Sequence, residues 1–122
     1  MTIQPLPHEF SICKLPNDAI LDLSRPFHFA ARTDVEFSLV CPTADVPKDA
    51  LVRDDGWRAF RIEGVLDFSL IGILARISDL LAKNRIGIFA VSTYNTDYIL
   101  TKAENFDRAL QALAEDGHHI LK

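Results

Sequence analysis

The chain has 122 residues, of which 48% are hydrophobic and 25% are charged, and its formal net charge at pH 7 is -4. A chain of this length forms one compact domain or two very small ones, and its apolar content can fill a core. These features exclude a barrel enzyme and a largely disordered protein. The acidic balance offers no attraction to phosphate backbones or anionic lipid, so we expect neither nucleic acid nor a membrane as a partner.

The two cysteines, Cys13 and Cys41, are too few for the disulfide framework of a small secreted protein. Both lie in apolar segments without a neighbouring histidine, which is typical of small buried side chains rather than nucleophiles. The first residues lack the apolar core of a signal peptide, and the longest apolar stretch, residues 70–75, ends at Arg76. The sequence therefore predicts a cytoplasmic protein.

The first half of the chain, residues 1–55, is predicted to be rich in strands and poor in helix. Apolar residues at alternate positions mark three strands. They are Phe10, Ile12 and Leu15 in the first, Phe27, Phe29 and Ala31 in the second, and Phe37, Leu39 and Cys41 in the third. Only residues 18–22 leave room for a helical turn, and the polar residues 42–56 are typical of a linker between two halves.

A weak internal repeat connects the two halves. Phe29-Ala30, followed by Thr33-Asp34 and an apolar strand, parallels Phe89-Ala90, followed by Thr96-Asp97 and an apolar strand. The pattern favours a shortened repeat of one unit.

The second half, residues 56–122, carries the clearest periodicity. Residues 57–63 alternate as in a half-buried strand, which ends at Gly64. A helix is predicted from Leu70 onward, with one apolar stripe and with Asn84 as its left-handed end. The stripe consists of Leu70, Ile73, Leu74, Ile77, Leu80 and Leu81.

Residues 86–93 predict another strand, residues 94–97 a turn, and residues 98–101 the hairpin partner of that strand. A second amphipathic helix, with Phe106, Leu110 and Leu113 on its apolar side, stops at Gly117, and residues 118–121 can form a last short strand. The order of strand, helix, strand, strand, helix and strand predicts an α+β fold with two helices on one face of an antiparallel sheet.

The run from Gly72 to Ser78, with Leu81-Ala82 and Ile86-Gly87-Ile88 after it, resembles the first helix and second strand of ACT domains, small regulatory modules that bind amino acids. The proline that usually precedes the glycine is replaced by Ile71. Residues 66–74 and 89–100 resemble a subgroup of small tandem ACT proteins, which is also distantly similar to a cytosolic arginine sensor. Residues 36–42 resemble the degenerate N-terminal half of that subgroup.

This resemblance implies a ferredoxin-like βαββαβ ACT domain over residues 56–122, preceded by a shortened ACT-like half over residues 1–55, both with antiparallel sheets. It implies a ligand site between two ACT units, near the loop that leads into the first helix, where the family glycine corresponds to Gly72. It also implies an acidic ligand contact at Asp97. The expected ligand-binding residues are Asp67, Ser69, Ile71, Gly72, Ser92, Thr93, Asn95 and Asp97.

These residues also have structural interpretations. A glycine at the start of a helix costs up to about 1 kcal/mol relative to alanine. At Gly72, either ligand access to the N–H groups of the first turn or close packing of the helix on the sheet would offset that cost. Asp97 could hold an ammonium group, but an aspartate in a turn most often binds its own backbone. Asp67 and Ser69 suit the cap of the helix.

The function expected from these features is that of a non-catalytic regulatory protein that binds a small molecule, an amino acid, and signals to a protein partner or acts as a homodimer. No cofactor or metal is expected, because His118 and His119 are adjacent on a strand and point to opposite faces. The alternative is an ACT-type assembly module that binds no metabolite. A small acylphosphatase-like hydrolase lacks support, because the phosphate loop with its arginine and asparagine is not visible.

Overall fold

A computed structural model describes residues 1–64 and 72–122 of the chain. The chain divides into two compact units, which we call the smaller unit (residues 8–57) and the larger unit (residues 1–7 and 58–122). Two strands, β1 (Thr2–Lys14) and β4 (Val52–Ile62), each contribute one part to each unit.

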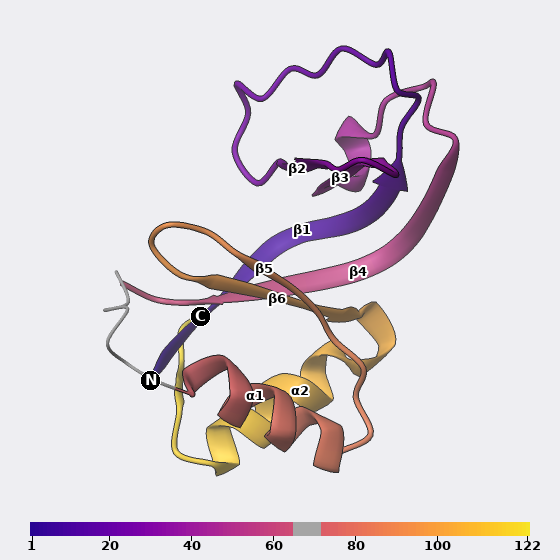
Figure 1. Cartoon of the computed structure of the whole chain (residues 1–122). Helices are drawn as coiled ribbons and strands as arrows, with labels where there is room; N and C mark the ends of the chain where they lie inside the picture. Colours follow the sequence, from indigo (N-terminus) through magenta and orange to yellow (C-terminus); the bar gives the residue numbers. More distant parts are fainter. Residues whose placement is uncertain (65–71) are drawn as a thin grey trace. The chain divides into compact units, whose positions relative to one another are not determined.

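The larger unit contains the predicted order of strand, helix, strand, strand, helix and strand (Figure 1). After β4 come α1 (Ile73–Lys83), β5 (Phe89–Ser92), β6 (Asp97–Lys102), α2 (Ala103–Glu115) and β7 (His119–Ile120). The two helices lie side by side on one face of the strands (Figure 1). Their apolar stripes form the core with the strands, because Ile77, Leu81, Phe106 and Leu113 are all buried in one cluster with Ile99 of β6.

The start of β1 completes the larger unit, in which the strand order is β7-β1-β4-β6-β5. β7 pairs with β1 in parallel, with Thr2 opposite His119 and Ile3 opposite Ile120. The prediction of wholly antiparallel sheets is wrong at this pair. Ile3 is fully buried in the core cluster of the larger unit, so this unit depends on a segment that the sequence pattern groups with the first half.

The smaller unit has the strand order β2-β3-β1-β4, with β2 (Phe29–Arg32) and β3 (Phe37–Pro42) as its other strands. No helix forms over residues 18–22, and the helical turn in this unit is the 3-10 helix η1 (Thr43–Asp45). Residues 42–56 are therefore not a linker, because they contain η1 and the first part of β4. The first residues of β4, from Val52 to Asp55, are all exposed, so they lack the apolar alternation that identifies a strand in a sequence.

The β2–β3 and β5–β6 hairpins have the same register, with each residue 60 positions from its counterpart. Phe29 lies opposite Val40, and Phe89 lies opposite Leu100. The turns match as well, because the amide of Thr33 donates to the carbonyl of Glu36 and the amide of Thr93 donates to the carbonyl of Thr96, both at 2.8 Å. The two hairpins compared in the sequence share this register, but Thr33 corresponds to Thr93 and not to Thr96.

The segments that follow these two hairpins differ from each other. Pro42 and Lys102 have almost the same backbone angles, with φ -53 and ψ 139 for Pro42 and φ -57 and ψ 142 for Lys102. Lys102 begins the 13 residues of α2, whereas Pro42 begins only the 3 residues of η1. Val46 is extended, with ψ 126, as expected of a residue before proline, and Pro47 prevents the helix from continuing.

The two helices of the larger unit end in the same way on different residues. Gly117 has φ 95 after α2, as the sequence predicts, and Arg85 has φ 60 after α1. Asn84 was expected in that left-handed position but has φ -92. The amide of Ile86 donates to the carbonyl of Leu81 at 2.9 Å, which closes the helix end and delays β5 until Phe89.

Candidate functional site

Gly72 stands immediately before α1 as its N-terminal cap residue. Its φ is 83, in the left-handed region that favours glycine. No atom of the described residues lies within 4 Å of the place where a Cβ would stand, so close packing against the sheet does not explain this glycine. Its carbonyl accepts the first helical hydrogen bond, from the amide of Arg76 at 2.9 Å. The backbone angle itself accounts for glycine at this position.

Ser92, Thr93, Asn95 and Asp97 lie together at the tip of the β5–β6 hairpin. The hydroxyl of Ser92 donates to Oδ1 of Asp97 at 2.6 Å, and these two residues are directly opposite in the hairpin register. The turn runs from Thr93 to Thr96, so Asp97 is the first residue of β6 and not a turn residue as expected. Its described partner is across the hairpin, and the carboxylate remains partly exposed.

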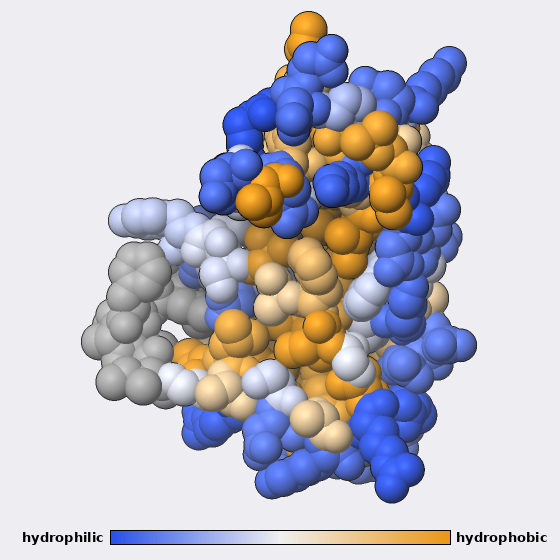
Figure 2. All heavy atoms as spheres, turned by 45° about the vertical axis from the view of Figure 1, so that its right-hand side comes forward, coloured by the Kyte–Doolittle hydropathy of each residue, from blue (hydrophilic) through white to orange (hydrophobic). Residues whose placement is uncertain are grey.

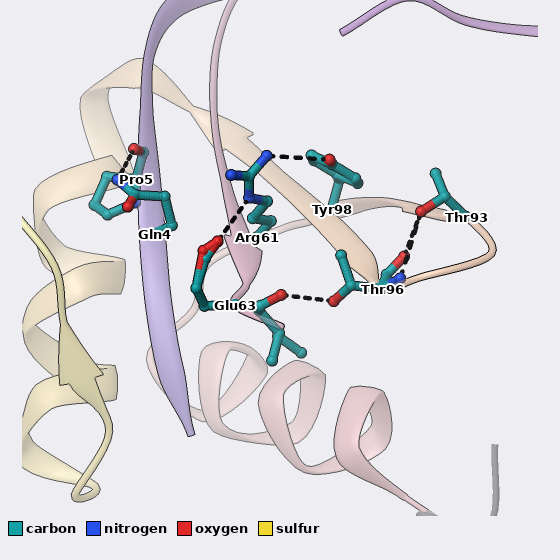
Figure 3. Close-up of polar contacts among 8 residues, drawn as sticks. Gln4, Pro5, Arg61, Glu63, Thr93, Thr96 and Tyr98 are labelled. Atoms are coloured by element: carbon teal, nitrogen blue, oxygen red, sulfur yellow. Dashed lines mark hydrogen bonds and ion pairs between the residues drawn. The ribbon is translucent and has the colours of Figure 1, made fainter. Parts of the chain in front are cut away.

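A hydrogen bond fixes this hairpin tip to the end of β4. Thr96 is only 6% exposed, and its hydroxyl donates to the carbonyl of Ile62 at 2.7 Å (Figure 3). Thr93 supports the same turn through its hydroxyl, which donates to the carbonyl of Thr96 at 2.9 Å. The hairpin tip is therefore held beside the point where the chain leaves β4 on its way to Gly72. Thr96 was not among the expected site residues, because a threonine in a turn gives no signal of burial.

A second set of polar side chains, which was not among the expected site residues, lies on and beside β4 and β6. Nε of Arg61 donates to Glu63 at 3.2 Å, and Nη1 donates to the hydroxyl of Tyr98 at 3.4 Å (Figure 3). The hydrogen bond to Tyr98 raises the pKa of Arg61 above its ordinary value, so the guanidinium keeps its charge. The alternation of residues 57–63 places this arginine on the face opposite the buried Phe60 and Ile62.

Three of the expected ligand-binding residues, Asp67, Ser69 and Ile71, lie outside the described residues, as does the predicted first residue of the helix, Leu70. Of the others, the structure groups Ser92, Thr93, Asn95 and Asp97 on one hairpin. In the described part of the chain, no hydrogen bond or ion pair joins this hairpin to Gly72.

The cysteines and histidines of the chain lie elsewhere. Cys13 and Cys41 are both buried, and burial raises the pKa of Cys41 to about 12 and also raises the pKa of Cys13. Nε2 of His118 lies 3.5 Å from a carboxylate oxygen of Asp116, whereas His119 is exposed in β7. Among the described residues, no three histidine, cysteine or acidic side chains gather as metal ligands.

A sheet with two helices on one face and a glycine before the first helix is shared by a class of small regulatory modules. The ACT domain model matches residues 52–115, which is more than half of the chain. The chain belongs to the ACT domain family, whose domains typically bind regulatory ligands. Within the described ranges, no helix has the length and apolar character needed to span a bilayer.

Several solved structures are similar to this chain. A protein of Agrobacterium tumefaciens matches with a TM-score of 0.86 and 30% identity over 98% of this chain and 91% of that chain. A protein of unknown function from Vibrio cholerae, described as a possible transport protein, matches with a TM-score of 0.74 and 20% identity over 93% of this chain and 88% of that chain. A comparison with curated proteins gives no match.

An aspartate kinase of Clostridium acetobutylicum, described as an allosteric enzyme, shares the fold with a TM-score of 0.63 and 12% identity. The match covers 93% of this chain but only 33% of the kinase. The likeness is therefore to one part of a larger enzyme.

Proposed function

We propose that this protein is a non-catalytic, cytoplasmic regulator that binds an amino acid at the N-terminal end of α1, beside the β5–β6 hairpin tip, and passes its occupancy to a protein partner. Membership of the ACT family supports the regulatory part of the proposal. Coupling between ligand and partner would require that the ligand binds more tightly to one state of the protein than to another.

The observation that carries the proposal is the start of α1. Gly72 is half-buried, it has no side chain, and no described atom occupies its Cβ position. The first amides of a helix have no partner within the helix and attract negative charge. A ligand carboxylate can therefore approach these amides without meeting a side chain of the cap residue.

The hairpin tip supplies the complementary charge. Asp97 presents a partly exposed carboxylate, and the bond from Thr96 to Ile62 holds the tip beside the end of β4. In the proposal, Asp97 binds the ammonium group of the ligand, and Ser92, Thr93 and Asn95 add hydroxyl and amide contacts. Asp67, Ser69 and Ile71, which precede α1 in the sequence, complete the proposed site.

The proposal includes a tandem organisation. We regard the larger unit as a ferredoxin-like ACT domain and the smaller unit as a shortened ACT-like half, corresponding approximately to residues 56–122 and 1–55. The matching hairpins and the matching angles of Pro42 and Lys102 support a common origin of the two. This organisation is also the basis for proposing membership of the small tandem subgroup and the distant likeness to the arginine sensor.

A thermal-shift screen of the amino acids tests the proposal, because a ligand at one hundred times its Kd adds about 2.7 kcal/mol to the free energy of unfolding. Gly72→Asn then tests the site. Asparagine tolerates a left-handed backbone, so the variant adds a side chain at the helix start without the strain that a branched residue would suffer. We expect the ligand-induced shift to disappear.

Gly117→Asn is the matched control, because Gly117 also has a positive φ of 95 but follows α2. It should lose a similar amount of intrinsic stability and keep the full ligand-induced shift. Equal affinity in wild type and in folded Gly72→Asn would contradict the proposed site.

Asp97→Asn tests the charge at the hairpin tip. The variant keeps the shape of the side chain and removes a charge-assisted bond of about 1.5–3 kcal/mol, so affinity measured by calorimetry should fall at least about tenfold. Asp107→Asn changes an exposed carboxylate on α2 and should leave affinity unchanged. If both variants bind equally well, Asp97 serves only to hold Ser92.

One observation favours the alternative of an assembly module without a metabolite. β5 is the last strand in the order of the larger unit, so one of its edges has no neighbouring strand among the described residues. An open edge can pair with a second chain. Light scattering across protein concentrations, combined with the screen, separates the two functions: a dimer that no amino acid stabilises supports the assembly module.

A further inference from the structure

The smaller unit has an open, solvent-accessible cavity of about 370 Å³ that neither the ACT family nor the proposed site accounts for. Its wall comes from three segments: residues 20–28, which precede β2, Leu39 in the middle of β3, and residues 44–47, which follow β3. The volume lies in the range of about 300–1,000 Å³ that small-ligand sites occupy.

The hairpin repeat explains why a cavity forms here. Leu39 corresponds to Ile99, 60 positions later, and Ile99 is covered by side chains of both α1 and α2 in the core cluster of the larger unit. The smaller unit has an irregular segment before β2 and the short η1 after β3 instead of these helices. A loop and one helical turn provide less side-chain volume than two helices, and although Leu39 itself is only 1% exposed, the segments around it leave an open cavity.

The cavity wall carries both signs of charge. Oδ1 of Asp45 accepts a hydrogen bond from Nη1 of Arg25 at 2.8 Å, and Oδ2 lies 3.5 Å from Nε2 of His28. The side chain of His28 is only 6% exposed, and its Nδ1 lies 2.9 Å from the carbonyl of Pro26. Asp45 is thus already paired with Arg25.

Two charged groups keep capacity for a ligand. The Arg25 side chain is 69% exposed, and only one of its five N–H groups is used by Asp45. Asp22 accepts a hydrogen bond from the amide of Ser24 at 2.9 Å, and hydrogen bonding from the side chain and backbone of Ser24 lowers the pKa of its carboxyl and keeps it ionised. The apolar part of the wall is formed by Leu21, Leu39, Val46 and Pro47.

We propose that this cavity binds a small zwitterion with an apolar body, with its carboxylate on Arg25, its cationic group on Asp22 and its apolar part against the half-buried Leu21 and Val46. A simple anion would meet the carboxylate of Asp22, and a simple cation would meet the guanidinium of Arg25. A molecule that carries both charges pairs with both groups, and bidentate pairing of carboxylate with guanidinium gives it a defined orientation. An α-amino acid with an aliphatic side chain is the simplest such molecule.

Calorimetry on the full chain tests the proposal with three probes that share one aliphatic body: L-leucine, isovalerate, which lacks the ammonium group, and isoamylamine, which lacks the carboxylate. We expect L-leucine to bind and each single-charge probe to bind at least tenfold more weakly. No detectable binding of L-leucine, or equal binding of isovalerate, overturns the proposal.

Arg25→Gln and Asp22→Asn locate the site. Both residues are exposed, so the variants should fold, and each should weaken L-leucine binding at least tenfold. Arg53→Gln is the matched control, because Arg53 is an exposed arginine of the same unit that also pairs with an aspartate, Asp55, at 3.1 Å, but lies outside the cavity wall. It should leave binding unchanged.

The Asp97→Asn variant separates this site from the one proposed at α1. Unchanged L-leucine binding in Asp97→Asn, with loss in Arg25→Gln, supports the cavity. Loss in Asp97→Asn with unchanged binding in Arg25→Gln overturns the cavity and supports the site at α1.

Discussion

The two units build the same hairpin and cover it differently. In the larger unit, α1 and α2 place a continuous set of buried side chains on the strands. In the smaller unit, one described cluster of buried residues consists of Cys13, Leu15, Phe37, Leu39 and Cys41, and only partly buried side chains from irregular segments pack against it. A hairpin with a fixed register therefore does not determine what packs on it, because the segments between the strands decide that.

The two units also differ in their exposed hydrophobic residues. Figure 2 shows hydrophobic side chains exposed among hydrophilic ones. The strongly exposed large hydrophobic residues of the smaller unit are Ile20, Leu23, Val35, Leu51 and Val52, whereas those in the described part of the larger unit are Met1 and Tyr94. Short irregular segments cannot turn one apolar side inward as a helix does, so apolar residues there remain in contact with water.

Ile3→Ala should give the largest loss of stability, because Ile3 is fully buried in the core of the larger unit. Truncating an isoleucine at such a site typically costs about 2–5 kcal/mol. Urea denaturation measures the loss. Ile20→Ala is the control in the smaller unit, where Ile20 is 97% exposed, and should change the free energy of unfolding by less than about 0.5 kcal/mol. Equal losses in the free energy of unfolding would contradict the contrast between the helix-packed larger unit and the smaller unit.

Thr96→Val should cost about 1–3 kcal/mol, because it removes the hydroxyl that donates to the carbonyl of Ile62 in a buried setting. Its counterpart in the other hairpin is Glu36, which is exposed. Glu36→Val should therefore change stability by less than about 0.5 kcal/mol. A comparably large effect at Glu36 would show that both turns are anchored in the same way.

High pH should destabilise the smaller unit through Cys41. Burial is the main cause that raises the pKa of this thiol to about 12 from an ordinary value of 9.0, which the unfolded chain retains. Above pH 9 the unfolded chain loses a proton that the folded chain keeps, so stability falls as pH rises toward 12. The loss should reach about 1 kcal/mol at pH 10.

The counterpart of Cys41 in the larger unit is Thr101, which does not ionise. Cys41→Ala should therefore reduce the pH slope measured by urea denaturation between pH 8 and pH 11, leaving the smaller contribution of Cys13. An unchanged slope would remove Cys41 as its source.

Thr33→Val and Thr93→Val should have the smallest effects on stability, and they compare the two turns directly. Each hydroxyl closes its hairpin turn, with Thr33 accepting from the amide of Glu36 at 3.1 Å and Thr93 donating to the carbonyl of Thr96 at 2.9 Å. The Thr33 contact is exposed and the Thr93 contact is partly buried, and each variant should lose about 0.5–1 kcal/mol. A clear difference between the variants in thermal denaturation would show that the two turns are not equivalent.

The order of elements in the larger unit follows from the sequence, because the apolar stripes of its helices repeat with the helical period. Element ends were less predictable. The left-handed position fell on Arg85, a residue with no preference for it, and the apolar Ile86 made residues 86–88 resemble the start of a strand. Ile86 is buried in the core cluster because it closes the end of α1, not because it begins a strand.

The contacts that cross between distant segments could not be predicted. The bond from Thr96 to Ile62 and the pairing of Thr2 with His119 join residues whose types give no local signal of either contact. For the candidate site, the sequence identified Gly72 as unusual but not the positive φ that requires it. The cavity of the smaller unit could not be predicted, since its lining comes from three segments that are separate in the sequence.

The pairing of β1 with β7 has a consequence for how the protein is made. Ile3 and Ile120 are neighbours in space although they lie far apart in the sequence. During synthesis, residues 8–57 can close their own hydrogen bonds before the second half of the chain has left the ribosome, but the carbonyls of Met1 and Ile3 cannot accept from the amides of His119 and Leu121 until β7 emerges. The larger unit is therefore the later of the two to finish folding, and its first-made residues are among the last to reach their final neighbours.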